Sequence, residues 1–299
     1  MASSKPTAAT LLNGLSLWGL PFFFLVSGLV ERRHLATRAE PLAEWTVSRV
    51  KRLLVPYLGW SAIYVALPYL NSIRGHGGPP AYDWIAVIFT GGALGPLWFL
   101  PMLFYVSVAA RAIGPRWRVF SLILAAIIAA AVFGALADGA ATWGFWLLSP
   151  WYFFLFVGGS FIPDLARRSA PPNGPLVLTA FAILMTLTSA AALALPHSQL
   201  EPIYATTVTV VPAAAAAALL WSAANGWELG RTRALAKFAP LLLGVYLSHT
   251  GWLMLWSRFV RPETTPMAVW LPLTFAVVTV LAFTTSAAFR RIPVLRAIV

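Results

Sequence analysis

The side chain best suited to proton transfer is a histidine inside an apolar stretch near the end of the chain, His249. An imidazole has an ordinary pKa of about 6.5, so it can take a proton from an attacking hydroxyl group. It lies about ten residues into the stretch, or about 15 Å deep if the stretch is an α-helix. A histidine at that depth favours a functional role, and the alternative is a structural histidine that joins two helices. Tyr246 lies one turn earlier on the same helix face.

A second group of residues is suited to binding an anion. Arg49 and Arg52 stand just before an apolar stretch that begins at Leu53. Residues three apart share a helix face, so the two guanidinium groups can hold one phosphate together. The alternative is that both arginines only anchor the end of a membrane helix.

Two more motifs interrupt apolar stretches. Ser27 and Gly28 follow an early aromatic run; small residues there let helices approach, and the hydroxyl can bond a neighbour. Trp98 stands between Pro96 and Pro101, and prolines free backbone groups that protein or cavity water must satisfy. A tryptophan at the membrane interface would explain Trp98 without a role in binding.

The composition identifies the elements that must position these side chains. Of 299 residues, 60% are hydrophobic and only 10% are charged, and the mean hydropathy is +0.78. Because soluble domains are about a quarter charged, we predict an all-α, polytopic transmembrane bundle that lies in a lipid bilayer. The chain has no cysteine, and its four histidines lack the spacing of a zinc site, so no metal is expected.

Apolar stretches long enough to cross a bilayer of about 30 Å recur along the whole chain. No long linker separates them, which favours a single integral membrane domain over residues 1–299. The nine predicted spans are approximately 11–30, 53–70, 95–113, 119–137, 142–162, 175–195, 203–222, 239–257 and 267–289.

Positive charge alternates between the loops and predicts the orientation. Of the 21 lysines and arginines, all but Lys5, Arg74, Arg258 and Arg261 lie on one side of the nine spans. Cytoplasmic loops carry the excess of these residues, so we expect an outside N-terminus and a cytoplasmic C-terminus. Residues 71–94 then form an outer loop. The net charge of +12 thus reports membrane orientation, and no nucleic-acid partner is expected.

Together the motifs resemble the membrane acyltransferase family 3, which includes polysaccharide O-acetyltransferases. The resemblance covers nearly the whole chain and depends on the order and the membrane sidedness of the motifs. The matching runs are Phe23–Leu29, Arg49–Pro56, Trp98–Leu100, Tyr152–Gly159 and Tyr246–His249.

The resemblance implies transfer of an acyl group, usually acetyl from acetyl-CoA, to a hydroxyl of a sugar or a cell-envelope glycan. It implies a place in the bacterial inner (cytoplasmic) membrane and acyl-CoA as co-substrate without a metal. The residues found fit this chemistry: His249 is suited to be the catalytic base, Arg49 and Arg52 could bind the phosphates of acyl-CoA, and Ser27, Trp98 and Tyr246 are the candidates for substrate binding.

The chain departs from the family pattern at its start. Family members begin with a further helix that carries an arginine and, about three turns later, a histidine regarded as catalytic, and no such pair precedes Phe22. Three interpretations stay open: a truncated or wrongly started copy, a base role for His249, or an inactive protein. Outside the enzyme class, the alternatives are a glycan or lipid transporter and a non-catalytic partner of an envelope complex.

Overall fold

The computed structural model describes the following residues: 19–37, 40–73, 81–90, 95–114, 117, 119–125, 127–128, 150–168, 179, 183, 241–260, 265–293 and 295–298. Within these ranges all regular structure is helical, which confirms the predicted all-α class for the described part of the chain. The chain forms two compact units. The first unit is Met1–Leu42 with Tyr105–Leu229, and the second is Ala43–Phe104 with Gly230–Val299.

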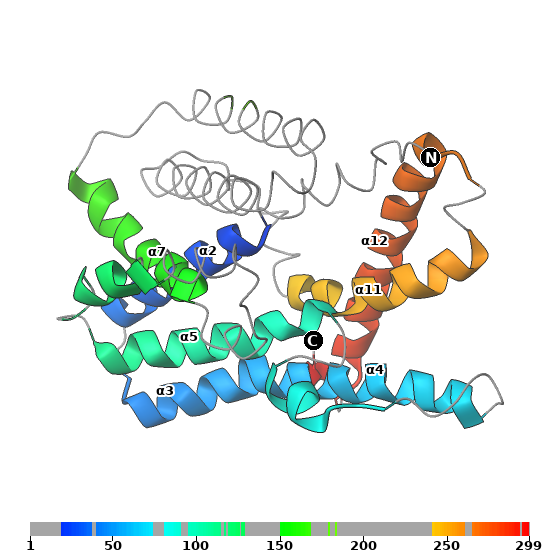
Figure 1. Cartoon of the computed structure of the whole chain (residues 1–299), viewed down its shortest axis with the longest axis horizontal. Helices are drawn as coiled ribbons and strands as arrows, with labels where there is room; N and C mark the ends of the chain where they lie inside the picture. Colours follow the sequence, from blue (N-terminus) through cyan, green and yellow to red (C-terminus); the bar gives the residue numbers. More distant parts are fainter. Residues whose placement is uncertain are drawn as a thin grey trace. The chain divides into compact units, whose positions relative to one another are not determined.

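A long helical rod forms the base of the second unit (Figure 1). α3 (Leu42–Arg49), the π-helical turn η1 (Val50–Leu54) and α4 (Val55–Ile73) follow one another without a break. The rod carries no charged side chain after Arg52, because residues that enter a bilayer must be apolar.

The π-helical turn has a local cause in the sequence. Pro56 has no N–H group, so it cannot donate to the carbonyl of Arg52 as an α-helix requires. The hydrogen-bond ladder shifts by one residue at this point, and the N–H of Val55 donates to the carbonyl of Val50 in the wider pattern of a π-helix. The turn that carries Arg52 is therefore wider than an ordinary helical turn.

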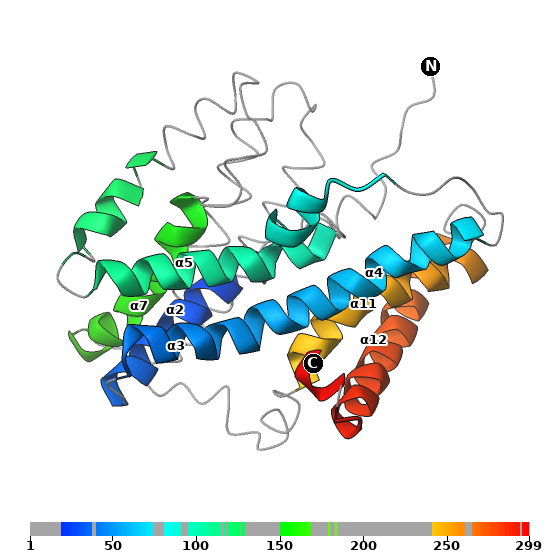
Figure 2. The same ribbon diagram turned by 90° about the horizontal axis from the view of Figure 1, so that it is seen from below.

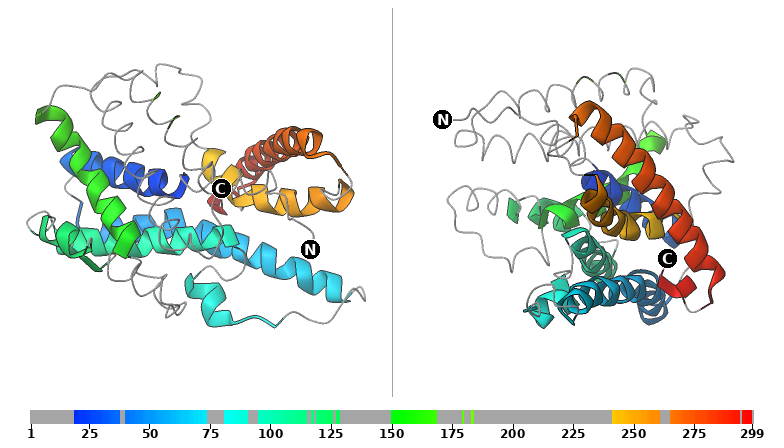
Figure 3. Two further views of the ribbon diagram at one scale, coloured as in Figure 1. Left: turned by 45° about the horizontal axis from the view of Figure 1, so that its top comes forward. Right: turned by 90° about the vertical axis from the view of Figure 1, so that its right-hand side faces the viewer.

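α11 (Leu242–Phe259) and α12 (Met267–Arg291) form an antiparallel pair in the second unit (Figure 3). At the end away from their connection, Ser286 Oγ donates a hydrogen bond to the carbonyl of Leu241 at 2.9 Å. The serine is completely buried, and a buried hydroxyl in a membrane helix needs a partner, which the neighbouring helix supplies here.

The C-terminal turn η7 (Leu295–Ile298) packs on the rod (Figure 2). Trp60 Nε1 donates to the carbonyl of Ile298 at 2.9 Å, and the Trp60 ring stacks on Phe289 with centroids 5.7 Å apart. One tryptophan of α4 thus holds both the end of α12 and the turn that follows it.

Between α4 and the next long helix, the structure contains two short helical segments and not only a loop. η2 (Ala86–Thr90) is π-helical, and η3 (Gly95–Trp98) leads directly into α5 (Phe99–Ile113). η3 and α5 together match the predicted span 95–113. η2 falls in residues 71–94, where the sequence predicts an outer loop.

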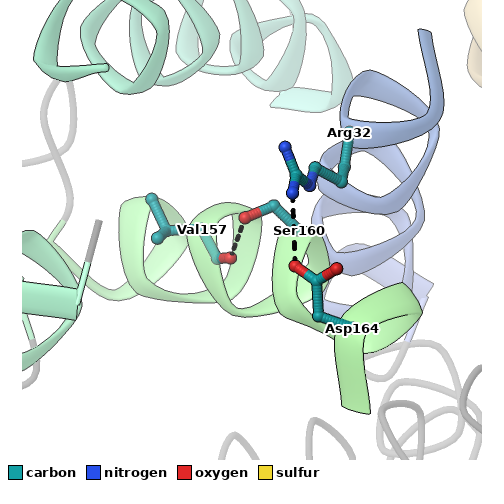
Figure 4. A network of polar contacts seen from close by, with 4 residues as sticks. All are labelled: Arg32, Val157, Ser160 and Asp164. Atoms are coloured by element: carbon teal, nitrogen blue, oxygen red, sulfur yellow. Dashed lines mark hydrogen bonds and ion pairs between the residues drawn. The ribbon is translucent and has the colours of Figure 1, made fainter. Parts of the chain in front are cut away.

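In the first unit, α2 (Gly19–Thr37) and α7 (Pro150–Arg168) pack along each other in a parallel direction. Near their N-terminal ends, Phe24 stacks on Tyr152 with ring centroids 4.5 Å apart. Near their C-terminal ends, a guanidinium nitrogen of Arg32 lies 3.4 Å from a carboxylate oxygen of Asp164 (Figure 4).

Two stretches of the described residues are long and apolar enough to cross a membrane, Leu42–Leu70 and Pro272–Arg291. The predicted span 203–222, all of 175–195 except residues 179 and 183, residues 126 and 129–137 of the span 119–137, and residues 142–149 of the span 142–162 fall outside the described residues. The number of spans, their sidedness, the single membrane domain and the additional family helix before Phe22 stay predictions.

Glycines in the middle of the α2–α7 pair let the two backbones touch. A Cβ atom on Gly28 would collide with the carbonyl of Phe156, and a Cβ on Gly159 would collide with the carbonyl of Leu25. These glycines belong to two separate sequence motifs, and the structure brings the motifs together. Close backbone approach through small residues is the usual means of helix association in a bilayer.

We therefore expect Gly28→Ala and Gly159→Ala to destabilise the first unit by about 1–3 kcal/mol, because each added methyl group overpacks a backbone contact. Thermal unfolding in detergent measures the effect as a lower Tm. Gly158→Ala is the matched control, since its Cβ would meet only Leu122 Cδ1, at 4.0 Å. Equal Tm values for all three variants would contradict the close approach.

Candidate active site

The predicted site residues divide between the two units. Ser27 is half-buried on α2 in the first unit. The second unit contains Arg49, Arg52, Trp98, Tyr246 and His249. The site can therefore be built from the second unit alone.

The hydrogen bonds of His249 fix which ring nitrogen carries the proton. Nδ1 contacts the backbone carbonyl of Tyr246, one turn earlier on α11. A carbonyl only accepts, so this contact assigns the proton to Nδ1 and leaves a lone pair on Nε2. The hydroxyl of Thr250 lies 3.2 Å from Nε2 and donates to it. The half-buried ring is thus held in the tautomer that can accept a proton at Nε2.

The turn that carries His249 is bonded to α4 by a residue that the sequence analysis did not identify. The hydroxyl of Tyr64 donates to the carbonyl of Leu247 at 2.6 Å and accepts from the N–H of Gly251 at 3.1 Å. In a regular α-helix the N–H of Gly251 would donate to the carbonyl of Leu247. The Tyr64 hydroxyl therefore bonds to both ends of the helical turn that includes His249.

Gly251 makes this approach possible. A Cβ atom at Gly251 would lie 3.0 Å from both the hydroxyl oxygen and the Cε1 atom of Tyr64, which is closer than side chains normally pack. Tyr64 itself is buried. A phenol hydroxyl in an apolar span needs a partner. This requirement is the sequence signal by which Tyr64 could have been found.

Aromatic rings connect His249 to the segment that contains Trp98. Tyr246 lies edge-on to Phe99, with ring centroids 5.2 Å apart and planes at 75°, and 5.5 Å from the ring of His249. α11 also packs against η3, whose last residue is the half-buried Trp98. The predicted residues Trp98, Tyr246 and His249 thus belong to one contiguous region of the second unit.

Arg49 and Arg52 lie before the first residue of α4: Arg49 is the last residue of α3, and Arg52 lies in η1. The guanidinium carbon of Arg49 lies 5.1 Å from the ring centre of the buried Trp45, a cation–π contact. Arg52 is exposed in the π-helical turn, where the wider turn places it further round the axis from Arg49 than an α-helix would. The two positive charges are still close enough to repel each other, so a bound anion would relieve that repulsion.

No cluster of histidine, aspartate and glutamate side chains with the arrangement of a metal site occurs among the residues that the structure describes.

The described residues are helical, and two of their stretches are long and apolar enough to cross a membrane, as in the class of membrane-embedded helical proteins. A model of the acyltransferase 3 family, described as an acyltransferase domain, matches residues 2–289. The chain belongs to this family of membrane acyltransferases and is an acyltransferase enzyme. No curated protein and no solved structure matches the chain.

The bond from Tyr64 to α11 leads to a prediction. We expect Tyr64→Phe to lower kcat about tenfold, or about 1.4 kcal/mol in activation free energy, while KM for the donor stays unchanged. The reason is that the variant keeps the packed ring but releases the turn that holds His249. Steady-state acyl transfer in membrane vesicles measures both constants.

Tyr69→Phe is the control, because Tyr69 is an exposed tyrosine further along the same helix. If Tyr64→Phe lowers only Tm and leaves kcat unchanged, the Tyr64 hydroxyl stabilises the unit without positioning the histidine.

Proposed function

We propose that this enzyme transfers an acetyl group from acetyl-CoA to a hydroxyl of a sugar or cell-envelope glycan at a bacterial inner membrane. Membership of the family supports the acyl transfer. The observation that carries the mechanism is the hydrogen bonding of His249, in which a backbone carbonyl holds Nδ1–H and leaves Nε2 as the acceptor.

In the proposed reaction, the acceptor hydroxyl attacks the thioester carbonyl carbon while Nε2 of His249 takes its proton. A C–O bond forms and the carbonyl oxygen gains a negative charge. The C–S bond then breaks, and the sulfur of CoA leaves with the proton from the imidazolium. The hydroxyl of Thr250, which donates to Nε2 in the resting enzyme, must rotate away as the base takes the proton.

Arg49 and Arg52 are proposed to bind the diphosphate and ribose phosphate of CoA, since paired guanidinium groups match phosphate oxygens. Tyr64 lies twelve residues after Arg52 on the same rod, which is about 18 Å along a helix axis. Tyr64 is hydrogen-bonded to the turn that carries His249. The length along the helix axis from Arg52 to Tyr64 is therefore also the separation between the proposed phosphate site and the proposed base. The extended pantetheine arm of CoA has to cover a separation of this kind between its phosphates and its sulfur.

Trp98 and Tyr246 are proposed to bind the acceptor, because the Tyr246 ring lies 5.5 Å from the ring of His249 and η3, which carries Trp98, contacts α11. Tyr246 is the proposed donor to the oxyanion, since a hydroxyl group can stabilise the charge that develops on the thioester oxygen. Ser27 belongs to the first unit and is not part of this proposed site.

The base role of His249 leads to a prediction with a large effect. His249→Gln should lower kcat about 100-fold or more, because general base catalysis contributes about 10²–10⁴, while the Kd for acetyl-CoA stays within about twofold. Transfer of radiolabelled acetyl groups from acetyl-CoA to glycan in vesicles measures kcat. His34→Gln, at a histidine that contacts Glu40 in the first unit, should keep full activity.

If His249→Gln is as active as the unchanged chain, another residue supplies the base and the proposed mechanism is wrong. If neither variant nor the unchanged chain transfers acetyl, the chain is inactive in this form.

The phosphate site leads to a separate prediction on binding. Arg49→Ala combined with Arg52→Ala should weaken acetyl-CoA binding by about 3 kcal/mol, or more than 100-fold, because two charge-assisted contacts are lost. Titration calorimetry in detergent at low and moderate salt measures the Kd. Lys51→Ala, an exposed cation between the two arginines, is the control. An unchanged Kd in the double variant would leave the arginines as anchors of the helix.

A further inference from the structure

Trp45 and Arg49 share one face of α3. They stand four residues apart in this helix, and residues with that spacing are neighbours on a helix surface. Helical side chains lean back towards the N-terminus, so the side chain of Arg49 extends over the preceding turn, where Trp45 lies. The structure contains the contact that this geometry allows, with the guanidinium carbon of Arg49 5.1 Å from the centre of the Trp45 ring.

The ring beneath Arg49 is held firmly by its surroundings. Trp45 is only 2% exposed, and a side chain in a close-packed interior cannot turn without displacing its neighbours. Arg49 itself is half-buried. The guanidinium group of Arg49 therefore rests on a rigid support.

An aromatic ring holds a cation without cancelling its charge. The ring attracts the guanidinium group through its quadrupole, whereas a carboxylate partner would neutralise the group and compete with a phosphate. The support also acts against the repulsion between Arg49 and Arg52, which would turn a freely moving side chain away. Trp45 thus keeps the full charge of Arg49 close to that of Arg52, as an anion with several phosphate groups requires.

A side chain that is ordered before the ligand arrives improves affinity. An arginine on a free helix surface samples many rotamers, and binding has to restrict them. The restriction of one such side chain weakens binding by about twofold to tenfold. A guanidinium group already held on a ring avoids much of this loss.

We propose that Trp45 is a positioning residue of the phosphate site, whose ring holds the guanidinium group of Arg49 in place for the phosphates of acyl-CoA. The inference rests on the proposed binding of acyl-CoA by Arg49 and Arg52. Trp45 acts through Arg49 and does not bind the phosphate itself. It precedes the motif Arg49–Pro56, so the motif does not identify it.

Four chains separate positioning from stability: the unchanged chain, Trp45→Leu, Arg49→Ala and the double variant. Titration calorimetry in detergent measures the Kd for acetyl-CoA, and thermal unfolding measures Tm. We expect Trp45→Leu to weaken binding about fivefold. In the Arg49→Ala background the same change should alter Kd by less than about twofold, because no guanidinium group is left to position.

Two further variants serve as controls. Trp45→Phe keeps an aromatic face for the cation, so its Kd should stay within about twofold of that of the unchanged chain. Trp60→Leu removes another buried tryptophan of the same rod. It should lower Tm as Trp45→Leu does, because both leave a cavity, but it should leave Kd within about twofold.

Two results would overturn the inference while the proposed phosphate site stands. The first is an unchanged Kd for Trp45→Leu when Arg49→Ala weakens binding. The second is an equal loss of affinity from Trp45→Leu with and without Arg49, which would mean that Trp45 only stabilises the fold. An unchanged Kd for Arg49→Ala would instead refute the role of Arg49 in the phosphate site, and this inference with it.

Trp45→Met replaces Trp45→Leu if the leucine variant does not fold. Methionine has no ring but adapts its shape to fill irregular gaps. The same results, measured with Trp45→Met, would then support or overturn the inference.

Discussion

The position of the candidate base depends on one contact, the hydroxyl of Tyr64 bonded into the turn Leu247–Gly251. In an apolar span a phenol cannot leave its hydroxyl without a partner. Gly251 lets the ring come close enough to reach the backbone of α11, which supplies that partner. This contact fixes α11 at one height along α4, and it therefore fixes the separation between His249 and the arginines of the rod.

Both units use the same physical means to hold helices together where water does not drive association. In the first unit, Gly28 and Gly159 bring two backbones into contact, and an ion pair and an aromatic stack lie on either side. In the second unit, a glycine admits a tyrosine hydroxyl. Lipid is as apolar as the helices, so close packing and specific polar bonds must supply the binding free energy. Small residues next to hydroxyl-bearing ones are thus the positions that decide the packing of this chain.

The sequence predicted the long helices well and their contacts poorly. Hydropathy placed 95–113 and 267–289 within two residues of the observed ends, because exclusion from water is a property of the residues alone. α2 continues past Arg32 to Thr37, since charged residues end an apolar stretch without ending a helix. The helical segment η2, the π-helical turn before Pro56 and the contacts of Tyr64 were not predicted. Each depends on a partner group supplied by another turn or helix, which a pattern along one segment does not contain.

For the site, the sequence proposes the side chains, and the structure describes the surroundings of one of them. The structural alternative for His249 was a histidine that joins two helices. Among the described residues, the carbonyl of Tyr246 and the hydroxyl of Thr250, which bond the ring, lie on α11 itself, and Tyr64 makes a bond between helices at this level. One partner is a fixed backbone carbonyl and the other is a rotatable hydroxyl, so the ring is oriented at Nδ1 while Nε2 can exchange its partner. An arrangement that fixes one nitrogen and leaves the other exchangeable is what a general base needs and what a structural histidine does not.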